Sequence, residues 1–126
     1  MTANSPSSQP DAAAADPAIS IDDFQRVDMR VGRVVAVEEF ERARRPSYRL
    51  AIDLGPLGTR RSSAGVKPYY TKDELVGRQV VCVVNFPPRN IAGFMSEVLV
   101  LGATEVDGRL RLLRPDQDAE LGSRIS

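Results

Sequence analysis

The chain has 126 residues, 42% of them apolar, which suits one domain with a single modest core and leaves no room for a second. Its 17 basic residues balance its 17 acidic residues, so it lacks the global positive field of a purely electrostatic nucleic-acid binder. It contains no histidine, and its single cysteine, Cys82, lies in an apolar run, so no Ser-His, Cys-His or His-metal site and no intrachain disulfide can form. We therefore expect a binding protein and no enzyme, with no metal site.

The N-terminal residues differ in composition from the rest of the chain. Residues 1–18 are mostly Ala, Ser, Pro and Asp, with no large apolar side chain after Met1, and they predict a disordered tail. The domain is expected to span residues 19–126 and to begin with a short helix that Ser20 caps. No apolar stretch reaches the roughly 18 residues that cross a bilayer, and the start lacks the basic and apolar regions of a signal peptide. We expect a soluble cytoplasmic protein without a membrane partner.

Three strands are predicted in the first half of the domain. The β-branched run from Arg30 to Val37 indicates a long strand, in which Gly32 would mark a bulge or tight bend. The next strand alternates apolar and polar residues, which places one set of side chains in the core: Tyr48, Leu50, Ile52 and Leu54. Residues 55–58 turn the chain, and residues 59–63 form the returning strand.

The second half adds a helical turn and more strands. A capping box at residues 71–74 predicts one helical turn that Gly77 ends, placed between the third and fourth strands as in an OB-fold. Strands are expected at residues 78–84 and 98–101, followed by a tight hairpin at residues 106–109. The predicted fold is all-β: a five-stranded Greek-key OB-fold barrel with short helical turns and N- and C-terminal extensions.

The segment between the strands at 78–84 and 98–101 is unusually specific for a connection. Pro87 and Pro88 remove two backbone donors, so the preceding strand must stop near Asn85 and the loop that follows is stiff. A stiff loop with polar side chains loses little entropy on binding, which favours recognition by Asn85, Arg89, Asn90 and Ser96. The alternative is a simple crossover that the prolines terminate.

The charges are unevenly distributed along the chain. Residues 42–61 contain six arginines and one acid, Asp53, and guanidinium groups bind phosphates in bidentate fashion and stack on bases. Arg42, Arg44 and Arg45 are candidate phosphate contacts, with a merely solubilising surface run as the alternative. Arg49 lies out of phase with the apolar positions of its strand, on the outer face, where it contacts RNA or is simply an exposed charge beside Asp53.

Aromatic and acidic residues have alternative interpretations too. Phe86 and Phe94 either stack on bases, form an apolar pocket for peptide side chains, or pack in the core. The adjacent acids Glu38 and Glu39 would point to opposite faces of a strand, so they predict solvated charges and no catalytic pair.

Four motifs together resemble a known family. They are Asp28 to Val35 (DMRVGRVV), Arg44 to Leu50 (RRPSYRL), Arg61 to Ala64 (RSSA) and Asn85 to Leu101 (NFPPRNIAGFMSEVLVL). In this order they resemble the CsaA family of bacterial secretion-associated chaperones, part of a wider group of tRNA-binding domains also found on bacterial methionyl- and phenylalanyl-tRNA synthetases. The likeness runs from about Ile21 to the C-terminus. The resemblance implies an OB-fold, a homodimer, no cofactor, and binding of tRNA-like RNA or unfolded polypeptide.

The motifs also differ from the synthetase-appended domains at one place. Those domains typically have a His-Pro-Asn-Ala-Asp-Lys-Leu-like stretch where this chain has Arg45 to Leu50, the CsaA-like version. Two hypotheses follow: a tRNA-binding protein that also binds unfolded or export-bound polypeptide, or a dedicated chaperone and secretion factor with incidental RNA affinity. The resemblance adds Ser62, Ser63 and Ser96 to the candidates. The expected RNA contacts are Arg42, Arg44, Arg45, Arg49, Arg61, Ser62, Ser63, Asn85, Arg89 and Ser96. The expected peptide contacts are Phe86, Pro88 and Phe94.

Overall fold

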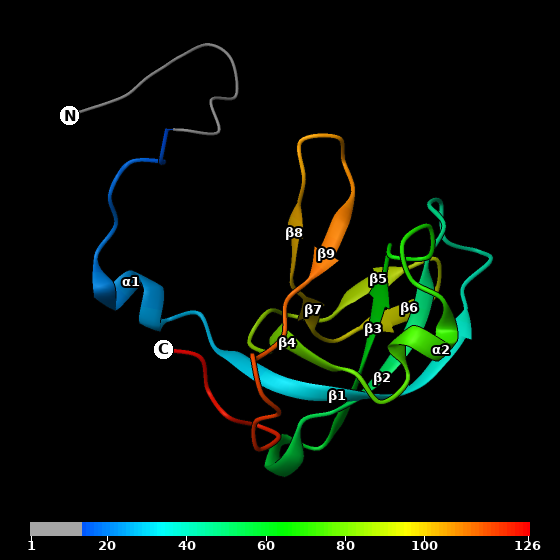
Figure 1. Ribbon diagram of the computed structural model, residues 1–126. Helices are drawn as coiled ribbons and strands as arrows, with labels where there is room; N and C mark the ends of the chain where they lie inside the picture. The colour runs from blue at the N-terminus through cyan, green and yellow to red at the C-terminus, as the bar shows by residue number, and fades with distance from the viewer. Residues whose placement is uncertain (1–13) are drawn as a thin grey trace.

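The computed structural model describes residues 14–126, and the first 13 residues of the expected tail lie outside the described part. Residues 14–20 are exposed and have no regular secondary structure. The largest sheet has five antiparallel strands in the order β3-β2-β1-β4-β7 and curls into a nearly closed barrel (Figure 1). Its strands are β1 (Met29–Glu39), β2 (Tyr48–Asp53), β3 (Thr59–Ala64), β4 (Gln79–Val83) and β7 (Leu99–Val100). The expected all-β OB-fold is confirmed.

The core fills the barrel as the alternation in β2 predicted. Tyr48, Leu50, Ile52 and Leu54 are each at most 5% exposed. Helix α2 (Lys72–Leu75) packs Leu75 into this core, where it is completely buried. The predicted capping box is present, because Thr71 and Glu74 exchange hydrogen bonds through their side chains and backbone N–H groups.

The bend in β1 differs from the prediction. The bulge lies between Val34 and Ala36, where the pairing with β2 shifts register, and not at Gly32. Gly32 is needed for a different reason: a Cβ atom there would lie 2.5 Å from Cγ2 of Ile52 and 2.8 Å from Cδ2 of Leu54. The glycine therefore permits close packing inside the barrel, and the neighbouring bulge provides the curvature.

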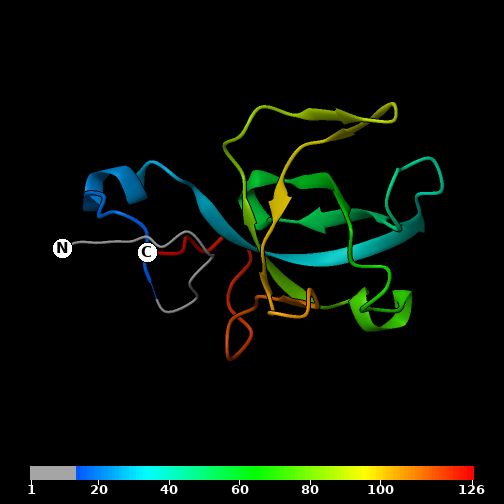
Figure 2. The ribbon, with the colours of Figure 1, turned by 90° about the horizontal axis from the view of Figure 1, so that it is seen from above.

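The stiff loop predicted after Asn85 is in fact a β-hairpin. Strands β5 (Arg89–Ile91) and β6 (Phe94–Ser96) pair across the two-residue turn Ala92–Gly93. Both turn residues have positive φ, 50° and 88°, which is the backbone geometry of a type I′ hairpin turn. The hairpin extends along one side of the barrel (Figure 2).

This hairpin also covers the free edge of β3 and closes the barrel. The backbone N–H of Glu97 donates to the carbonyl of Arg61 at 2.7 Å, and the Arg61 N–H donates to the Glu97 carboxylate at 2.8 Å. The Ser63 N–H donates to the hydroxyl of Ser96 at 3.1 Å. Side chains thus satisfy two edge donors that would otherwise lack partners.

The second hairpin and the two ends of the chain complete the structure. The expected hairpin is formed by β8 (Gly102–Thr104) and β9 (Leu110–Leu112), and the turn η1 (Gly55–Leu57) connects β2 to β3. The C-terminal residues 122–125 pair with the start of β1, through hydrogen bonds such as Val31 N–H to Ser123 O at 2.9 Å. Helix α1 (Ile21–Gln25), capped by Ser20, buries no residue and projects from the barrel on the side of the C-terminus (Figure 1).

Among residues 14–126, no helix has the length and apolarity that crossing a membrane requires.

Candidate nucleic-acid interface

The outer face of the barrel carries two of the predicted arginines side by side. Because Leu50 and Ser62 face the interior, the alternation of β2 and β3 directs Arg49, Arg61 and Ser63 outward. Arg49 lies opposite Ser63 in the register, and Arg61 lies opposite Ala51. The sheet thus supplies two neighbouring guanidinium groups, and the small Ala51 leaves room between them.

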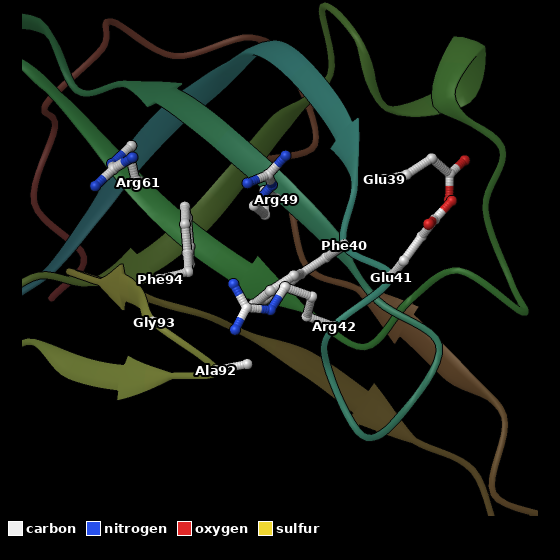
Figure 3. A pocket seen from close by; sticks show the side chains of 9 residues that line it. All are labelled: Glu39, Phe40, Glu41, Arg42, Arg49, Arg61, Ala92, Gly93 and Phe94. Atoms are coloured by element: carbon white, nitrogen blue, oxygen red, sulfur yellow. The ribbon is translucent and has the colours of Figure 1, made fainter.

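A pocket of about 460 Å³ opens beside these arginines, between the β1–β2 connection (residues 40–47) and the β5–β6 turn. We call it the arginine pocket. Figure 3 shows Arg42 reaching toward Phe94 from the connection, and Glu39 and Glu41 grouped at the other side of Phe40. The residues that line the pocket are Glu39, Phe40, Glu41, Arg42, Arg49, Arg61, Ala92, Gly93 and Phe94.

Two phenylalanine rings form the floor of the arginine pocket. The Phe40 and Phe94 rings pack with centroids 5.3 Å apart and planes tilted by 60°. Cζ of Arg61 lies 4.8 Å from the Phe94 centroid, and Cζ of Arg49 lies 5.7 Å and 5.9 Å from the two rings. These are cation–π distances, and they hold the guanidinium groups in place. The rings are only 5% and 8% exposed, so they support the arginines and present little surface of their own.

The carboxylates beside the arginine pocket are unevenly paired. Nη2 of Arg49 lies 3.3 Å from the Glu38 carboxylate, whereas Nε of Arg49 is buried without a hydrogen-bond partner. Glu39 faces away from Arg49 and binds Lys67 and Lys72. The hydrogen bond from Lys67 lowers the pKa of the Glu39 carboxyl, against the opposing effect of desolvation. The two adjacent acids thus point to opposite faces, as predicted, but each pairs with cations instead of being only solvated.

Two of the pocket arginines keep free donors. Within the described residues, neither Arg42 nor Arg61 has a carboxylate within ion-pair distance. The arrangement presents planar cations with unused N–H groups on a surface open to solvent. Such a surface can bind phosphate and stack on bases.

The structure brings four predicted residues together and separates others. Arg42, Arg49, Arg61 and Phe94 meet in the arginine pocket, while the exposed Arg44 and Arg45 lie in the same β1–β2 connection outside its lining.

The three serines carried over from the resemblance lie at or beneath this surface. Ser63 is half-buried on the outer face. Ser62 is 0% exposed, and its hydroxyl donates to the carbonyl of Ser63. It therefore packs inside the barrel, where a ligand on the surface cannot reach it. Ser96 is 2% exposed, and its hydroxyl oxygen accepts a hydrogen bond from the backbone N–H of Ser63.

The residues predicted from the Pro-Pro segment are spread over a wider area. Asn85 binds the backbone at both ends of its amide: it accepts from the Asp28 N–H at 3.0 Å and donates to the Arg26 carbonyl at 2.8 Å. Arg89 is exposed at the base of the β5–β6 hairpin. Phe86 and Pro88 are exposed too, whereas Phe94 is buried, so the three expected peptide contacts do not form one surface.

Sequence reasoning missed two residues of this site. Phe40 forms half of the aromatic floor, and Glu38 is the ion-pair partner of Arg49. No pattern of neighbouring residues in the sequence marks either of them, and Phe40 contacts Phe94 only through tertiary packing. The register of β1 on β2, which places Glu38 opposite Arg49, could have indicated the ion pair.

Comparisons with known proteins agree with this picture. A family model described as "Putative tRNA binding domain" matches residues 29–124. Methionine--tRNA ligase of Thiobacillus denitrificans is 42% identical over 113 residues, which cover 85% of this chain and 16% of the ligase. The corresponding ligase of Methanosarcina acetivorans is 37% identical over 109 residues, 86% of this chain and 15% of the ligase. The chain thus spans only a small part of these relatives.

Solved structures show the same fold over their whole length. The CsaA chaperones of Bacillus anthracis and Picrophilus torridus are both 45% identical, with TM-scores of 0.83 and 0.81. They match 87% and 86% of this chain and 100% of their own. A MetRS related protein of Pyrococcus horikoshii is 25% identical with a TM-score of 0.80, covering 88% of this chain and 100% of that chain. The resemblance that the four motifs indicated is confirmed.

Proposed function

The chain belongs to the family of tRNA-binding domains, and from that premise we propose that it binds tRNA or tRNA-like RNA through the arginine pocket. One observation carries the proposal most directly: Arg42, Arg49 and Arg61 gather over a floor of two phenylalanine rings on the outer face of the barrel. OB-folds bind nucleic acid on this kind of surface, where a cationic groove lies beside stacking groups. The role is binding without catalysis and without a cofactor.

The exposed residues around the pocket extend the proposed RNA surface. Arg44 and Arg45 lie in the β1–β2 connection that borders it, and Arg89 is exposed at the base of the hairpin that forms its other border. Phosphates that pass over the pocket would meet these side chains. Their contribution would be electrostatic and independent of RNA sequence.

The proposal is tested by titrating labelled tRNA at several salt concentrations with the wild-type chain, with Arg42→Ala in the pocket lining and with Arg89→Ala at the pocket border. Loss of one phosphate contact should weaken binding and reduce the salt slope by roughly one counterion. Arg109→Ala is the matched control, because Arg109 pairs with Glu105 and Asp107 on the β8–β9 hairpin and lies outside the pocket. Absence of tRNA binding by the wild-type chain would overturn the proposed function.

Binding of unfolded or export-bound polypeptide is a second proposed function, favoured by the 45% identity to two CsaA chaperones over their full length. Phe86 is 50% exposed and Pro88 is exposed beside it, so this loop offers apolar surface to a client. Phe86→Ser should reduce suppression of aggregation of a chemically denatured test protein and leave tRNA affinity unchanged. Equal suppression by the variant would remove this loop from the polypeptide site.

A homodimer in the cytoplasm is the assembly that we propose for this function. Ile21 is 71% exposed on α1, a helix that buries none of its residues within the chain, and Ile19, just before this helix, is equally exposed. A second copy would cover this surface, and pairing would double the RNA contacts. Light scattering coupled to gel filtration should give twice the chain mass, and Ile21→Glu should shift it toward the monomer. A monomeric wild-type chain at micromolar concentration would contradict the proposal.

A further inference from the structure

We propose that the arginine pocket receives one unpaired nucleotide, whose base stacks on the guanidinium plane of Arg61 and whose phosphate replaces Glu38 as the partner of Arg49. This inference rests on the proposed RNA binding and names the part of the RNA that the pocket selects. Its evidence is the exposure of the pocket lining, the shape of the pocket and the incomplete pairing of Arg49.

The exposed lining of the pocket favours a base over an apolar side chain. Phe40 and Phe94 are almost fully buried, so a peptide side chain would find little bare ring to cover. Arg61, in contrast, is exposed, and its Cζ lies 4.8 Å from the centroid of the Phe94 ring. Guanidinium planes stack on splayed-out bases, and an exposed guanidinium that an aromatic ring supports is well placed to do so.

The shape of the pocket favours a single unpaired nucleotide over a duplex. Its volume of about 460 Å³ lies in the range of small-ligand sites, roughly 300–1,000 Å³. The β1–β2 connection and the Ala92–Gly93 turn border it on two sides. Bases inside an RNA helix are stacked and cannot enter such a recess, whereas a base in a loop or bulge can.

The pairing of Arg49 indicates where the phosphate binds. Its Nη2 lies 3.3 Å from the Glu38 carboxylate, and its buried Nε has no acceptor. Glu38 therefore engages one corner of a group that can hold an oxyanion with two parallel hydrogen bonds. A phosphate that turned Arg49 away from Glu38 would satisfy both donors. Glu38 then acts as a weak competitor that limits the affinity of the empty pocket for anions.

The base-stacking part of the proposal is tested with two RNAs, a fully paired duplex and the same duplex with one bulged 2-aminopurine. The wild-type chain should bind the bulged RNA about tenfold more tightly and change its fluorescence. Arg61→Lys keeps the charge and removes the plane, so it should lose this preference and retain the salt slope. Melting curves of both proteins verify that they are folded.

The possible outcomes separate this inference from the proposed function. Tight binding of tRNA with equal binding of the paired and bulged duplexes would overturn the inference alone. Failure to bind any of the three RNAs would overturn both. Displacement of the 2-aminopurine RNA by an unfolded peptide, together with equal affinity for the two duplexes, would assign the pocket to polypeptide instead.

The role of Glu38 is tested with Glu38→Gln and the matched control Glu41→Gln, which removes the same charge from the pocket lining without affecting an ion pair of Arg49. Glu38→Gln should tighten binding of the bulged duplex by about threefold to tenfold and increase the salt slope by about one ion. Glu41→Gln should have a clearly smaller effect. Equal gains in the two variants would show a general field effect and overturn the displacement of Glu38.

Discussion

Arginine serves two different purposes at two places in this molecule. At the start of β1, Arg30 donates from Nε and Nη2 to the Asp28 carboxylate at 2.6 Å and 3.3 Å and from Nη1 to the Gly122 carbonyl at 3.0 Å. Arg124 donates to the Gln25 carbonyl at 2.6 Å, and Asn85 binds the backbone next to them. We call Asp28, Arg30, Asn85 and Arg124 the anchor cluster. It ties the start of β1, the segment after β4, the end of α1 and the C-terminal residues together.

In the arginine pocket the same residue type is held by rings and keeps its donors free. Arg61 lies at cation–π distance from Phe94 and pairs with no carboxylate of the described residues, and Arg49 has one exposed ion pair and an unpaired Nε. The comparison teaches that the use of the N–H groups distinguishes a structural arginine from a binding one. Composition alone cannot make this distinction, because both kinds count equally in the charge balance.

The largest effect should come from breaking the anchor cluster at Arg30. Arg30→Ala removes three hydrogen bonds and leaves the half-buried Asp28 carboxylate without its main partner. We expect the melting temperature to fall by about 5 °C or more, with tRNA affinity unchanged in the folded protein. Differential scanning calorimetry measures the first quantity. An unchanged melting temperature would show that the cluster is not structural.

Removal of a pocket arginine should produce the opposite result. Arg61→Ala takes away a stacking plane and a phosphate donor, so tRNA affinity should fall by about tenfold. The melting temperature should change little, because the backbone of residue 61 retains its hydrogen bonds with Glu97. Fluorescence anisotropy and a melting curve on the same sample measure both. Strong destabilisation with intact binding would erase the difference between the two regions.

Asn85 tests where the boundary between the two regions lies. Its side chain binds Asp28 and Arg26, so Asn85→Ala should cost about 1 kcal/mol of unfolding free energy. Urea titration gives this value, and a tRNA titration of the same variant should give the wild-type affinity. Weaker tRNA binding with wild-type stability would place Asn85 on the RNA surface, as its motif position suggests.

The anchor cluster should also give the protein a measurable acid sensitivity. The hydrogen bond from Arg30, helped by the charges of Arg30 and Arg124 and opposed by burial, lowers the pKa of the Asp28 carboxyl. A lowered pKa stabilises the fold at pH values above the unfolded value of about 3.9, and this stabilisation is lost as pH falls through the lower folded value. Asp28→Asn should therefore be less stable than wild type at pH 7, by about 1 kcal/mol or less.

The urea midpoints of wild type and Asp28→Asn at pH 7 and pH 3 measure this sensitivity. The difference between the two proteins should shrink toward pH 3 as the carboxyl takes up a proton. A difference that stays constant over this range would exclude ionisation of Asp28 as its source.

The smallest effect is expected outside both regions. Residues 1–18 contribute no large apolar side chain after Met1, so their deletion should leave the melting temperature nearly unchanged. RNA binding should stay the same or tighten slightly, because the deletion removes only acidic charge. The melting temperature and tRNA affinity of the truncated protein show how small a change is without structural meaning, and the effects of the four substitutions are compared with that change.

The parts of the fold that depend on neighbours in the sequence were predictable. The alternation from Tyr48 to Leu54 gave the buried face of β2, and Thr71 with Glu74 gave α2. The β5–β6 hairpin was missed, because Pro87 and Pro88 directly before it indicated a loop and its Ala-Gly turn is a weak signal. Gly32 does have a structural role, as predicted, but that role is close packing in the barrel. The sequence could not show that the bulge lies about three residues later in the strand.

The candidate site was only partly predictable. An arginine-rich segment was visible, and phase placed Arg49 outside the barrel. The convergence of Phe40 with Phe94 depends on the hairpin folding back over β3, and the binding of Asn85 to Arg26 joins segments that are distant in the sequence. Such contacts are set by tertiary packing, which local patterns do not encode.

The pairing of residues 122–125 with the first residues of β1 has a consequence for the order in which the protein is made. β2 and β3 follow β1 closely, so the far half of β1 can find its neighbours while translation is still under way. The near half, at Met29 to Val31, pairs with β4 along one edge, but its other edge must wait until the last turn of the described chain has left the ribosome. Until then an unpaired strand edge is exposed to every other nascent chain nearby, and a pause in translation before residue 122 would prolong that exposure.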